Sequence, residues 1–178
     1  QVQAVALQAD GKTIIGGDFT AFNTWPRNRI ARVQTDGQID PSFVIGTGAD
    51  NYIKTIAIQD DGRILIGGGF TSFNGTLRYS IARLLPNGSV DPSFNPGIGA
   101  DGPINTAVIQ ADGKILIGGE FNYFDGTNRN YIARLNTNGT LDVTFDPGEG
   151  PNGPVNSIAL SEGTLDIDRQ AAGGQAED

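Results

Sequence analysis

The sequence predicts an all-β fold made of tandem four-stranded antiparallel units, and three observations carry this prediction. The first is an internal repeat with a period of 51 residues, present in three copies without insertion. The second is an alternation of apolar and polar residues with a period of two, which is typical of strands and not of helices. The third is a set of Asp-Gly and Asn-Gly pairs between the apolar runs, which favour tight hairpin turns. Four short strands in such a unit have the size of one β-propeller blade.

The repeat is specific, because 17 of its 51 aligned columns hold the same residue in all three copies. A fourth copy begins at Pro154 and follows the pattern to Leu160. Residues 161–178 lack the repeat signature and contribute −4 of the net charge of −8, so we expect this acidic tail to fray or to serve a different role. The predicted boundaries are 1–51, 52–102 and 103–153 for the repeats, and 154–178 for the partial repeat with its tail.

Four strands are expected in each unit, and the first repeat shows why. Val2–Leu7 alternates and ends at an Asp-Gly turn, and Lys12–Phe19 is a buried, isoleucine-rich strand that contains a glycine pair. Arg29–Val33 alternates again before the next turn. Ile39–Phe43 is a brief fourth strand, and its Asp-Pro step indicates an irregular edge.

The recurring residues have structural explanations. Gly16 and Gly17 allow the backbones of neighbouring blades to approach closely. Phe19, Phe22 and Phe43 are expected to fill the space between neighbouring sheets. The columns of Arg27, Arg32 and Asp40 are the same in every copy, which predicts salt bridges within or between blades. A unique active site would appear once, so this repetition favours a structural role.

The sequence resembles the delta-60 repeat family, a bacterial β-propeller domain of unknown function. The resemblance is carried by ALQADGKTIIGGDF, AIQDDGRILIGGGF and VIQADGKILIGGEF, each followed by Ile-Ala-Arg, a glycine turn and Asp-x-x-Phe. It covers residues 1 to about 160. It implies a secreted or cell-surface protein built of tandem blades, and it provides no catalytic residues to carry over.

Three and a part blades are too few for a closed propeller, which typically has four to eight. The chain is therefore expected to be a segment of a longer array, or to pair with a second copy in a ring of about seven blades with shared strands. A β-trefoil or β-prism is the alternative for a threefold repeat, although Trp25 does not recur as a trefoil signature would. Open edge strands at both ends predict self-association in a ring or a filament.

Composition excludes several kinds of chemistry, because the chain contains no Cys, His or Met. Thiol and imidazole catalysis and thiolate metal centres are ruled out, and we expect no cofactor and no metal site. The acidic balance of 20 acidic against 12 basic residues argues against a nucleic-acid or anionic-membrane partner. No apolar run is long enough to span a membrane.

Carboxylates that are unique to one copy are the candidates for hydrolase chemistry. They do not form a uniform acidic ring, so loop acids are the expected explanation and no catalytic residue is predicted. Two oxygen-rich loops, Asn136–Asp142 and Asp36–Asp40, only partly match a calcium loop and are expected to be Asx turns. The unique acids are Asp18, Glu120, Asp125, Asp146 and Glu149.

Other short motifs have equally plain explanations. Asn74, Asn87 and Asn138 fit the glycosylation sequon, but each precedes glycine and predicts a turn. Gly16–Gly17 and Gly118–Gly119 lack the Lys-Ser/Thr and the helix of a phosphate loop. Aromatic residues in loops are candidates for stacking on sugars or on a protein ligand, although they do not share one column. These residues are Trp25, Tyr52, Tyr79, Tyr123 and Tyr131.

The expected function is that of a non-enzymatic structural or adhesive β-propeller module of a secreted or cell-surface bacterial protein. It is expected to associate with itself through open edge strands. A carbohydrate-binding propeller is the first alternative and a glycan hydrolase the second. The sequence identifies no ligand-binding residues.

Overall fold

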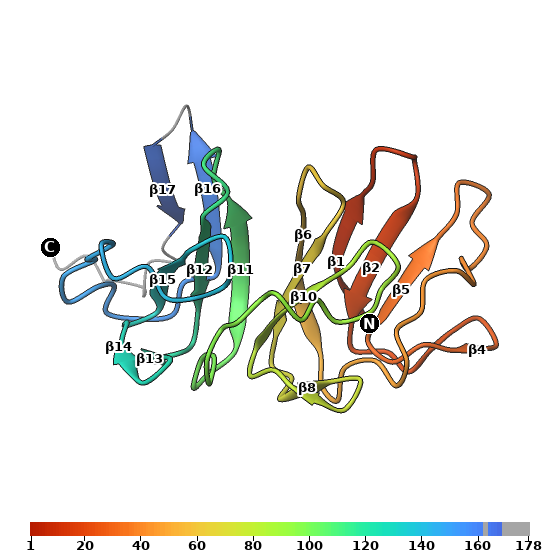
Figure 1. Ribbon diagram of the computed structural model, residues 1–178, viewed down its shortest axis with the longest axis horizontal. Helices are drawn as coiled ribbons and strands as arrows, with labels where there is room; N and C mark the ends of the chain where they lie inside the picture. Colours follow the sequence, from red (N-terminus) through yellow and green to blue (C-terminus); the bar gives the residue numbers. More distant parts are fainter. Residues whose placement is uncertain (162–163, 169–178) are drawn as a thin grey trace, which may run out of the picture.

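The computed structural model describes residues 1–161 and 164–168, and all regular structure in these ranges is β (Figure 1). Each 51-residue repeat contributes one three-stranded antiparallel sheet, in which the second strand lies in the middle. The first sheet consists of β1 (Val2–Leu7), β2 (Thr13–Gly17) and β5 (Ile30–Val33). The second consists of β6 (Ile53–Ile58), β7 (Ile64–Gly68) and β10 (Ile81–Leu84). The third consists of β11 (Ile104–Ile109), β12 (Ile115–Gly119) and β15 (Ile132–Leu135).

A short hairpin lies between the second and third strands of every sheet. Its tip carries an Asn or Asp with positive φ in each repeat, namely Asn23, Asn74 and Asp125. The hairpins are β3–β4 (Ala21–Phe22 and Trp25–Pro26), β8–β9 (Ser72–Phe73 and Thr76–Leu77) and β13–β14 (Tyr123–Phe124 and Thr127–Asn128).

The all-β, four-segment antiparallel unit is confirmed, and its fourth segment is attached by a single bridge. Ile39 pairs with Val33, and the equivalent residues pair in the other two repeats. The segment does not continue as a ladder, because the Asp40 carboxylate accepts a hydrogen bond from the backbone N–H of Ser42 at 2.9 Å and turns the chain. The Asp-Pro step therefore marks the irregular edge that the sequence predicted.

The sheets follow one another side by side in the order of the sequence (Figure 1), with the first strands β1 and β6 in contact, and β6 and β11 likewise. Glycine makes this approach possible. A Cβ added to Gly16 would lie 2.7 Å from Cγ2 of Ile53 in the next repeat, which is closer than side chains pack. This stack of separate sheets is the blade arrangement of a propeller, and the trefoil and prism alternatives are not observed in the described ranges.

The core lies between consecutive sheets. Phe43 of the first repeat and Phe70 and Phe73 of the second belong to one fully buried cluster with Ile53. An equivalent cluster joins the second and third repeats. The predicted role of the phenylalanines is thus confirmed for the interior repeats. Phe19 and Phe22, the equivalents of Phe70 and Phe73 in the first repeat, are only partly buried.

The partial fourth repeat forms two paired strands, β16 (Ser157–Ser161) and β17 (Thr164–Asp168). Val155 and Ile158 are buried in a cluster with Leu116 of the third repeat. Two alternatives were expected for residues 161–178, fraying or a different role. Fraying is wrong for β17, because this segment pairs with β16 along its length, and a different role stays a prediction. The rest of that expectation concerns residues 162–163 and 169–178, which lie outside the described ranges.

No helix in the described part of the chain is long and apolar enough to cross a membrane.

Candidate functional site

The most elaborate polar site is a cluster of five side chains that we call the repeated polar cluster, and in the first repeat it consists of Lys12, Arg32, Asp40, Ser42 and Phe43. The Asp40 carboxylate lies 2.9 Å from Nε of Arg32 and 3.0 Å from Nζ of Lys12. It also accepts a hydrogen bond of 2.7 Å from the Ser42 hydroxyl. The Arg32 guanidinium lies 4.8 Å from the centre of the Phe43 ring, within cation–π range. The other three polar side chains thus converge on the buried carboxylate of Asp40.

The same cluster forms in the other two repeats. Asp91 lies 2.7 Å from Nε of Arg83, and Asp142 lies 2.7 Å from Nε of Arg134. The predicted salt bridges of the Arg32 and Asp40 columns are therefore confirmed. Arg27 makes no ion pair among the described residues. It lies after the β3–β4 hairpin, and its guanidinium donates to the carbonyl oxygen of Pro26 at 2.9 Å, so that part of the expectation is wrong.

The cluster also links each repeat to the next. Nη1 of Arg32 donates a hydrogen bond of 2.7 Å to the carbonyl oxygen of Pro86 in the second repeat. Nη1 of Arg83 donates one of 2.6 Å to the carbonyl oxygen of Thr137 in the third. A single arginine therefore holds a carboxylate in its own blade and a turn in the following blade. Such charge-assisted hydrogen bonds are among the stronger ones in proteins.

The carboxylates of the cluster remain ionised under acidic conditions. Burial raises the pKa of Asp40, but the hydrogen bonds from Ser42 and Lys12 and the charge of Arg32 outweigh it and hold the pKa well below the ordinary value. Asp91 has a lowered pKa for the same kind of reasons. The pKa of Asp142 is lowered first by the Thr144 hydroxyl and then by Lys114. An acid held in this state is a poor general acid or base near neutral pH.

The acids that are unique to one repeat do not come together. Asp18 pairs with Arg29, and Glu120 lies 4.0 Å from the ammonium of Lys54. The Asp125 carboxylate accepts the backbone N–H of Ile98 in the preceding repeat at 3.0 Å, and that of Asp146 accepts the N–H of Gly148 in its own loop. The backbone carbonyl of Glu149 accepts a hydrogen bond from the side chain of Asn130. Among the side chains of residues 1–160, no three acids gather as metal ligands would. Each of these acids has a structural partner, either in its own loop or in the neighbouring repeat.

The two oxygen-rich loops and the sequons form turns. Oδ1 of Asp36 accepts the N–H of Gln38 at 2.9 Å, and Oδ1 of Asn138 accepts the N–H of Thr140 at 3.1 Å. Asn87 makes the same contact with Ser89, and Asn74 has a positive φ of 46°. These are Asx turns and turn geometries, as the sequence predicted. The glycine pairs lie inside β2 and β12 and pack against neighbouring strands instead of forming a loop.

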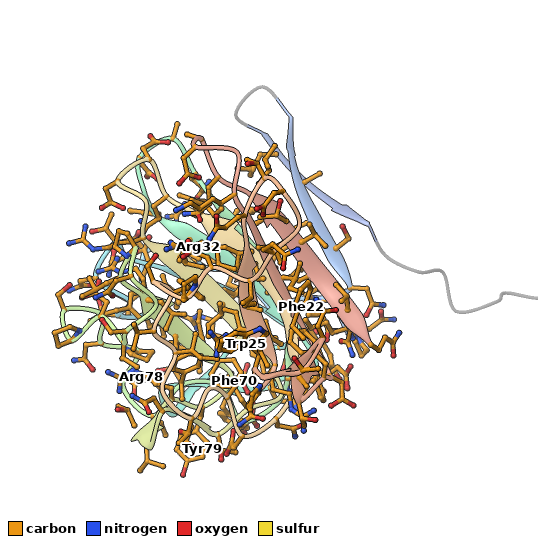
Figure 2. The ribbon with its side chains drawn as sticks, turned by 90° about the vertical axis from the view of Figure 1, so that its right-hand side faces the viewer. Phe22, Trp25, Arg32, Phe70, Arg78 and Tyr79 are labelled. Carbon is orange, nitrogen blue, oxygen red and sulfur yellow. The ribbon has the colours of Figure 1, made fainter. Side chains whose placement is uncertain are left out.

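Two of the candidate aromatic residues share a cleft of about 460 Å³ between the second and third repeats. Tyr79 and Tyr123 line it together with Ile98 and Asp101, and both tyrosines are exposed. The backbone fixes them, because Ala100 N–H donates to Tyr79 O at 3.3 Å and Asp101 N–H to Tyr123 O at 3.1 Å. Trp25 is exposed in another hairpin, shown in Figure 2, and Tyr52 and Tyr131 are partly buried.

Sequence reasoning missed Ile98 and Asp101. Oδ1 of Asp101 accepts the backbone N–H groups of Asn122 and Tyr123, both at 2.8 Å, and so holds the hairpin beside the cleft. Asp50 makes the equivalent contacts with Thr71 and Ser72. Asp50 and Asp101 are one repeat period apart in the sequence, and this recurrence could have indicated their shared role.

Stacked antiparallel units of one size, joined by the same polar cluster, define a tandem-repeat β-propeller module. The chain belongs to the family described as "Domain of unknown function (DUF5122) beta-propeller", whose profile matches residues 8–43, 59–94 and 110–145. Each matched segment runs from the first Asp-Gly turn to the phenylalanine of the polar cluster. The resemblance found in the sequence is thus confirmed.

A solved structure of a protein of unknown function from Bacteroides caccae is similar to this chain. The similarity has a TM-score of 0.45 and an identity of 12%, and it covers 77% of this chain and 46% of the other. This chain therefore spans less than half the length of that protein. No curated protein is similar enough in sequence to count as a relative.

Proposed function

We propose that the chain is a non-enzymatic structural and adhesive module, in which β-propeller blades present their loops and associate with further copies. The observation that carries the proposal is the repeated polar cluster, because its arginines join consecutive blades at 2.7 Å and 2.6 Å. The cluster recurs in all three repeats and bonds the first to the second and the second to the third, which supports a role in joining repeats.

The proposed location is the outside of a bacterial cell, in a secreted or cell-surface protein. This part of the proposal rests on the resemblance to the bacterial repeat family. Cell fractionation of the source organism, with the chain followed by antibody, tests it. Recovery in the cytoplasm alone would contradict it.

Self-association is tested by sedimentation velocity of the full chain over a wide range of concentration. The proposal predicts a mass that rises with concentration, because unpaired strands or faces at the ends of the stack invite pairing. A stable monomer at every concentration would contradict self-association by edge strands or by any other surface.

The non-enzymatic role is tested on a panel of glycans, the substrates of the hydrolase alternative. The proposal predicts no saturable turnover, since the buried carboxylates are held ionised by their partners. Turnover that disappears when one pair of carboxylates is replaced by amides would overturn it.

Carbohydrate binding is the second candidate, and the cleft between Tyr79 and Tyr123 favours it. Aromatic rings stack on the apolar faces of sugars, and the hydroxyl and carboxylate groups nearby can bond to sugar hydroxyls. Binding to a glycan array that is lost in Tyr79→Ala and Tyr123→Ala, and kept in Trp25→Ala, would support this candidate. Equal binding by all three variants would rule out the cleft as the site.

A further inference from the structure

The first repeat exposes an apolar surface whose equivalents in the second and third repeats are buried or partly buried. We call it the head face, and it consists of Val2, Val5, Leu7, Phe19 and Phe22. Val2 is 49% exposed and Val5 is 63% exposed. Ile53 and Ile104, the equivalents of Val2, are 0% exposed, and Ala107, an equivalent of Val5, is 7% exposed. Figure 2 shows Phe22 on the side of the molecule that the first repeat forms.

The interior interfaces show what covers such a face. In the second repeat, Ile53, Phe70 and Phe73 pack in one cluster with Phe43 and Ala49 of the preceding repeat. Ile104, Phe121 and Phe124 of the third repeat pack in the same way with Phe94 and Ala100. The usual occupant of a head face is therefore the trailing side of another repeat of this kind.

The turn at Asp36 and Gly37, which lies beside the head face, lacks the contacts that the equivalent turns make with a preceding repeat. Gly88 lies against the ring of Phe43, and Gly139 against the ring of Phe94. Gly37 is the equivalent glycine in the first repeat, and no described residue would touch a Cβ there within 4 Å. The carbonyl oxygens of Asn87 and Asn138 accept backbone hydrogen bonds of 2.7 Å from the preceding repeat. In the described ranges Asp36, their equivalent, accepts none from another repeat.

The third repeat offers the matching groups on what we call the tail surface, formed by Arg134, Phe145 and Asp146. The Arg134 side chain is 22% exposed, whereas that of Arg83 is 7% exposed. Nη1 of Arg134 donates to no carbonyl of the described residues, although Arg32 and Arg83 each reach one in the following repeat. Phe145 is only partly buried, and Phe43 and Phe94 are each 1% exposed.

We propose that the head face of one copy of this chain binds the tail surface of a second copy, and repeats between molecules the interface found twice within the chain. Phe145 of one copy then packs on Gly37 of the other, and Arg134 donates to the carbonyl oxygen of Thr35. The proposal rests on the proposed function, since it names the surfaces through which copies associate. It differs from edge-strand pairing, because sheets meet face to face.

The partial fourth repeat competes with this contact. Val155 packs against Gly118 in the way that Ile53 packs against Gly16, so β16 occupies an inner-strand position. In the pairing of two copies, Val2 of the second copy takes that position and β16–β17 moves aside. This displacement weakens the association. The contact is therefore concentration-dependent and weaker than the interfaces inside the chain.

The symmetry of the contact decides the assembly. A head-to-tail interface is heterologous, so it produces a ring where the rotation closes and a filament where it does not.

Disulfide cross-linking tests the pairing, and the natural chain contributes no cysteine to interfere. Asp36→Cys is made in one batch of full-length chain and Asp146→Cys in another, and the two are mixed under mild oxidation. These positions are equivalent to Asn87 and Val44, which are joined within the chain by a backbone hydrogen bond of 2.7 Å. The double variant Val44→Cys/Asn87→Cys therefore calibrates the geometry by forming an internal disulfide.

The expected result is a covalent heterodimer that forms faster than in the matched control, where Leu77→Cys replaces Asp36→Cys. Leu77 is 65% exposed and lies in a hairpin of the second repeat, away from the head face. Val5→Glu is expected to weaken self-association by about tenfold or more in sedimentation, because the pairing would bury its charge. Leu77→Glu is expected to leave self-association unchanged.

The outcomes separate the two proposals. A chain that is monomeric at every concentration overturns both self-association and this pairing. A chain that self-associates, yet cross-links at positions 36 and 146 no faster than the control and is insensitive to Val5→Glu, overturns the head-to-tail pairing alone. Self-association through edge strands would then stand.

Discussion

The first and second repeats have nearly the same sequence pattern and very different surroundings. The second repeat is covered on both faces of its sheet, and Ile53, Phe70 and Phe73 are 0% exposed. The first repeat is covered on one face only, so that Val2 and Val5 are largely exposed. The difference teaches that burial in this fold comes from the neighbouring blade and not from the repeat itself, as expected for a quasi-one-dimensional array.

The largest expected effect is the loss of an interior cluster arginine. Arg83→Ala leaves the carboxylate of Asp91 buried with one partner fewer and removes the hydrogen bond to Thr137. We expect the free energy of unfolding to fall by about 3–5 kcal/mol, as for a broken buried ion pair. Urea denaturation measures it.

The matched control is Arg134→Ala, because the Arg134 side chain is more exposed and, among the described residues, donates its hydrogen bonds only to Asp142 and Thr144 of its own repeat. We expect a loss of about 1–2 kcal/mol from its hydrogen bonds to Asp142. Equal losses in the two variants would contradict a role of the cluster in joining repeats.

Replacing a phenylalanine in the second or the first repeat should give a slightly smaller difference in stability than the two arginine variants do. Phe70→Ala removes a fully buried ring between the first two sheets and should cost about 3–4 kcal/mol of the free energy of unfolding. Phe19→Ala removes the equivalent, partly buried ring of the head face and should cost about half as much. Thermal unfolding monitored by circular dichroism, at a concentration where the chain is monomeric, compares the two. A larger loss for Phe19 would reverse the comparison.

The glycine that separates adjacent blades should give a moderate effect. A Cβ at Gly67 would lie 2.8 Å from Thr55 and 2.9 Å from Ile104, so Gly67→Ala forces the second and third sheets apart. We expect a loss of about 1–3 kcal/mol in urea denaturation, as for overpacking of a core. Gly153→Ala serves as the control, because no described atom lies within 4 Å of the added Cβ. A loss in the control as large as in Gly67→Ala would show that crowding is not the cause.

The smallest expected effect is a dependence of stability on pH. The pKa of Asp40, Asp91 and Asp142 is lower in the folded chain than in the unfolded chain. Their contribution to stability is therefore complete above the unfolded pKa of about 4 and is lost as the pH falls toward the folded pKa. Urea midpoints measured across the acid range should decline below about pH 4. Asp91→Asn should flatten this decline, and an unchanged slope would contradict the assignment.

Much of the fold could be predicted from the sequence because the period repeats each signal three times. The strand Val2–Leu7 has the bounds that the sequence predicted. The close approach of Ile53 to Gly16 explains the glycine pair in the next strand. The fourth segment was less predictable, because the Asx turn of Asp40 replaces ladder pairing after one bridge. Strand β17 has no repeat signature, so no pattern indicated that it would pair.

The site was predicted only in part, for two physical reasons. The Arg32–Asp40 pair recurs in the sequence, but its acceptors in the next repeat are backbone carbonyls, which leave no mark on residue type. The cleft of Tyr79 and Tyr123 escaped prediction because the two tyrosines belong to different columns of different repeats. Only the stacking of the repeats brings them together.

Hydrogen–deuterium exchange by mass spectrometry tests most directly the claim that the neighbouring blade determines burial. At low concentration, amides of β1–β2 should exchange faster than those of β6–β7, because opening free energies follow local packing. At high concentration, protection should rise in β1–β2 and around Phe145, where the head face meets the tail surface. Equal exchange of β1–β2 and β6–β7 at low concentration would contradict the account.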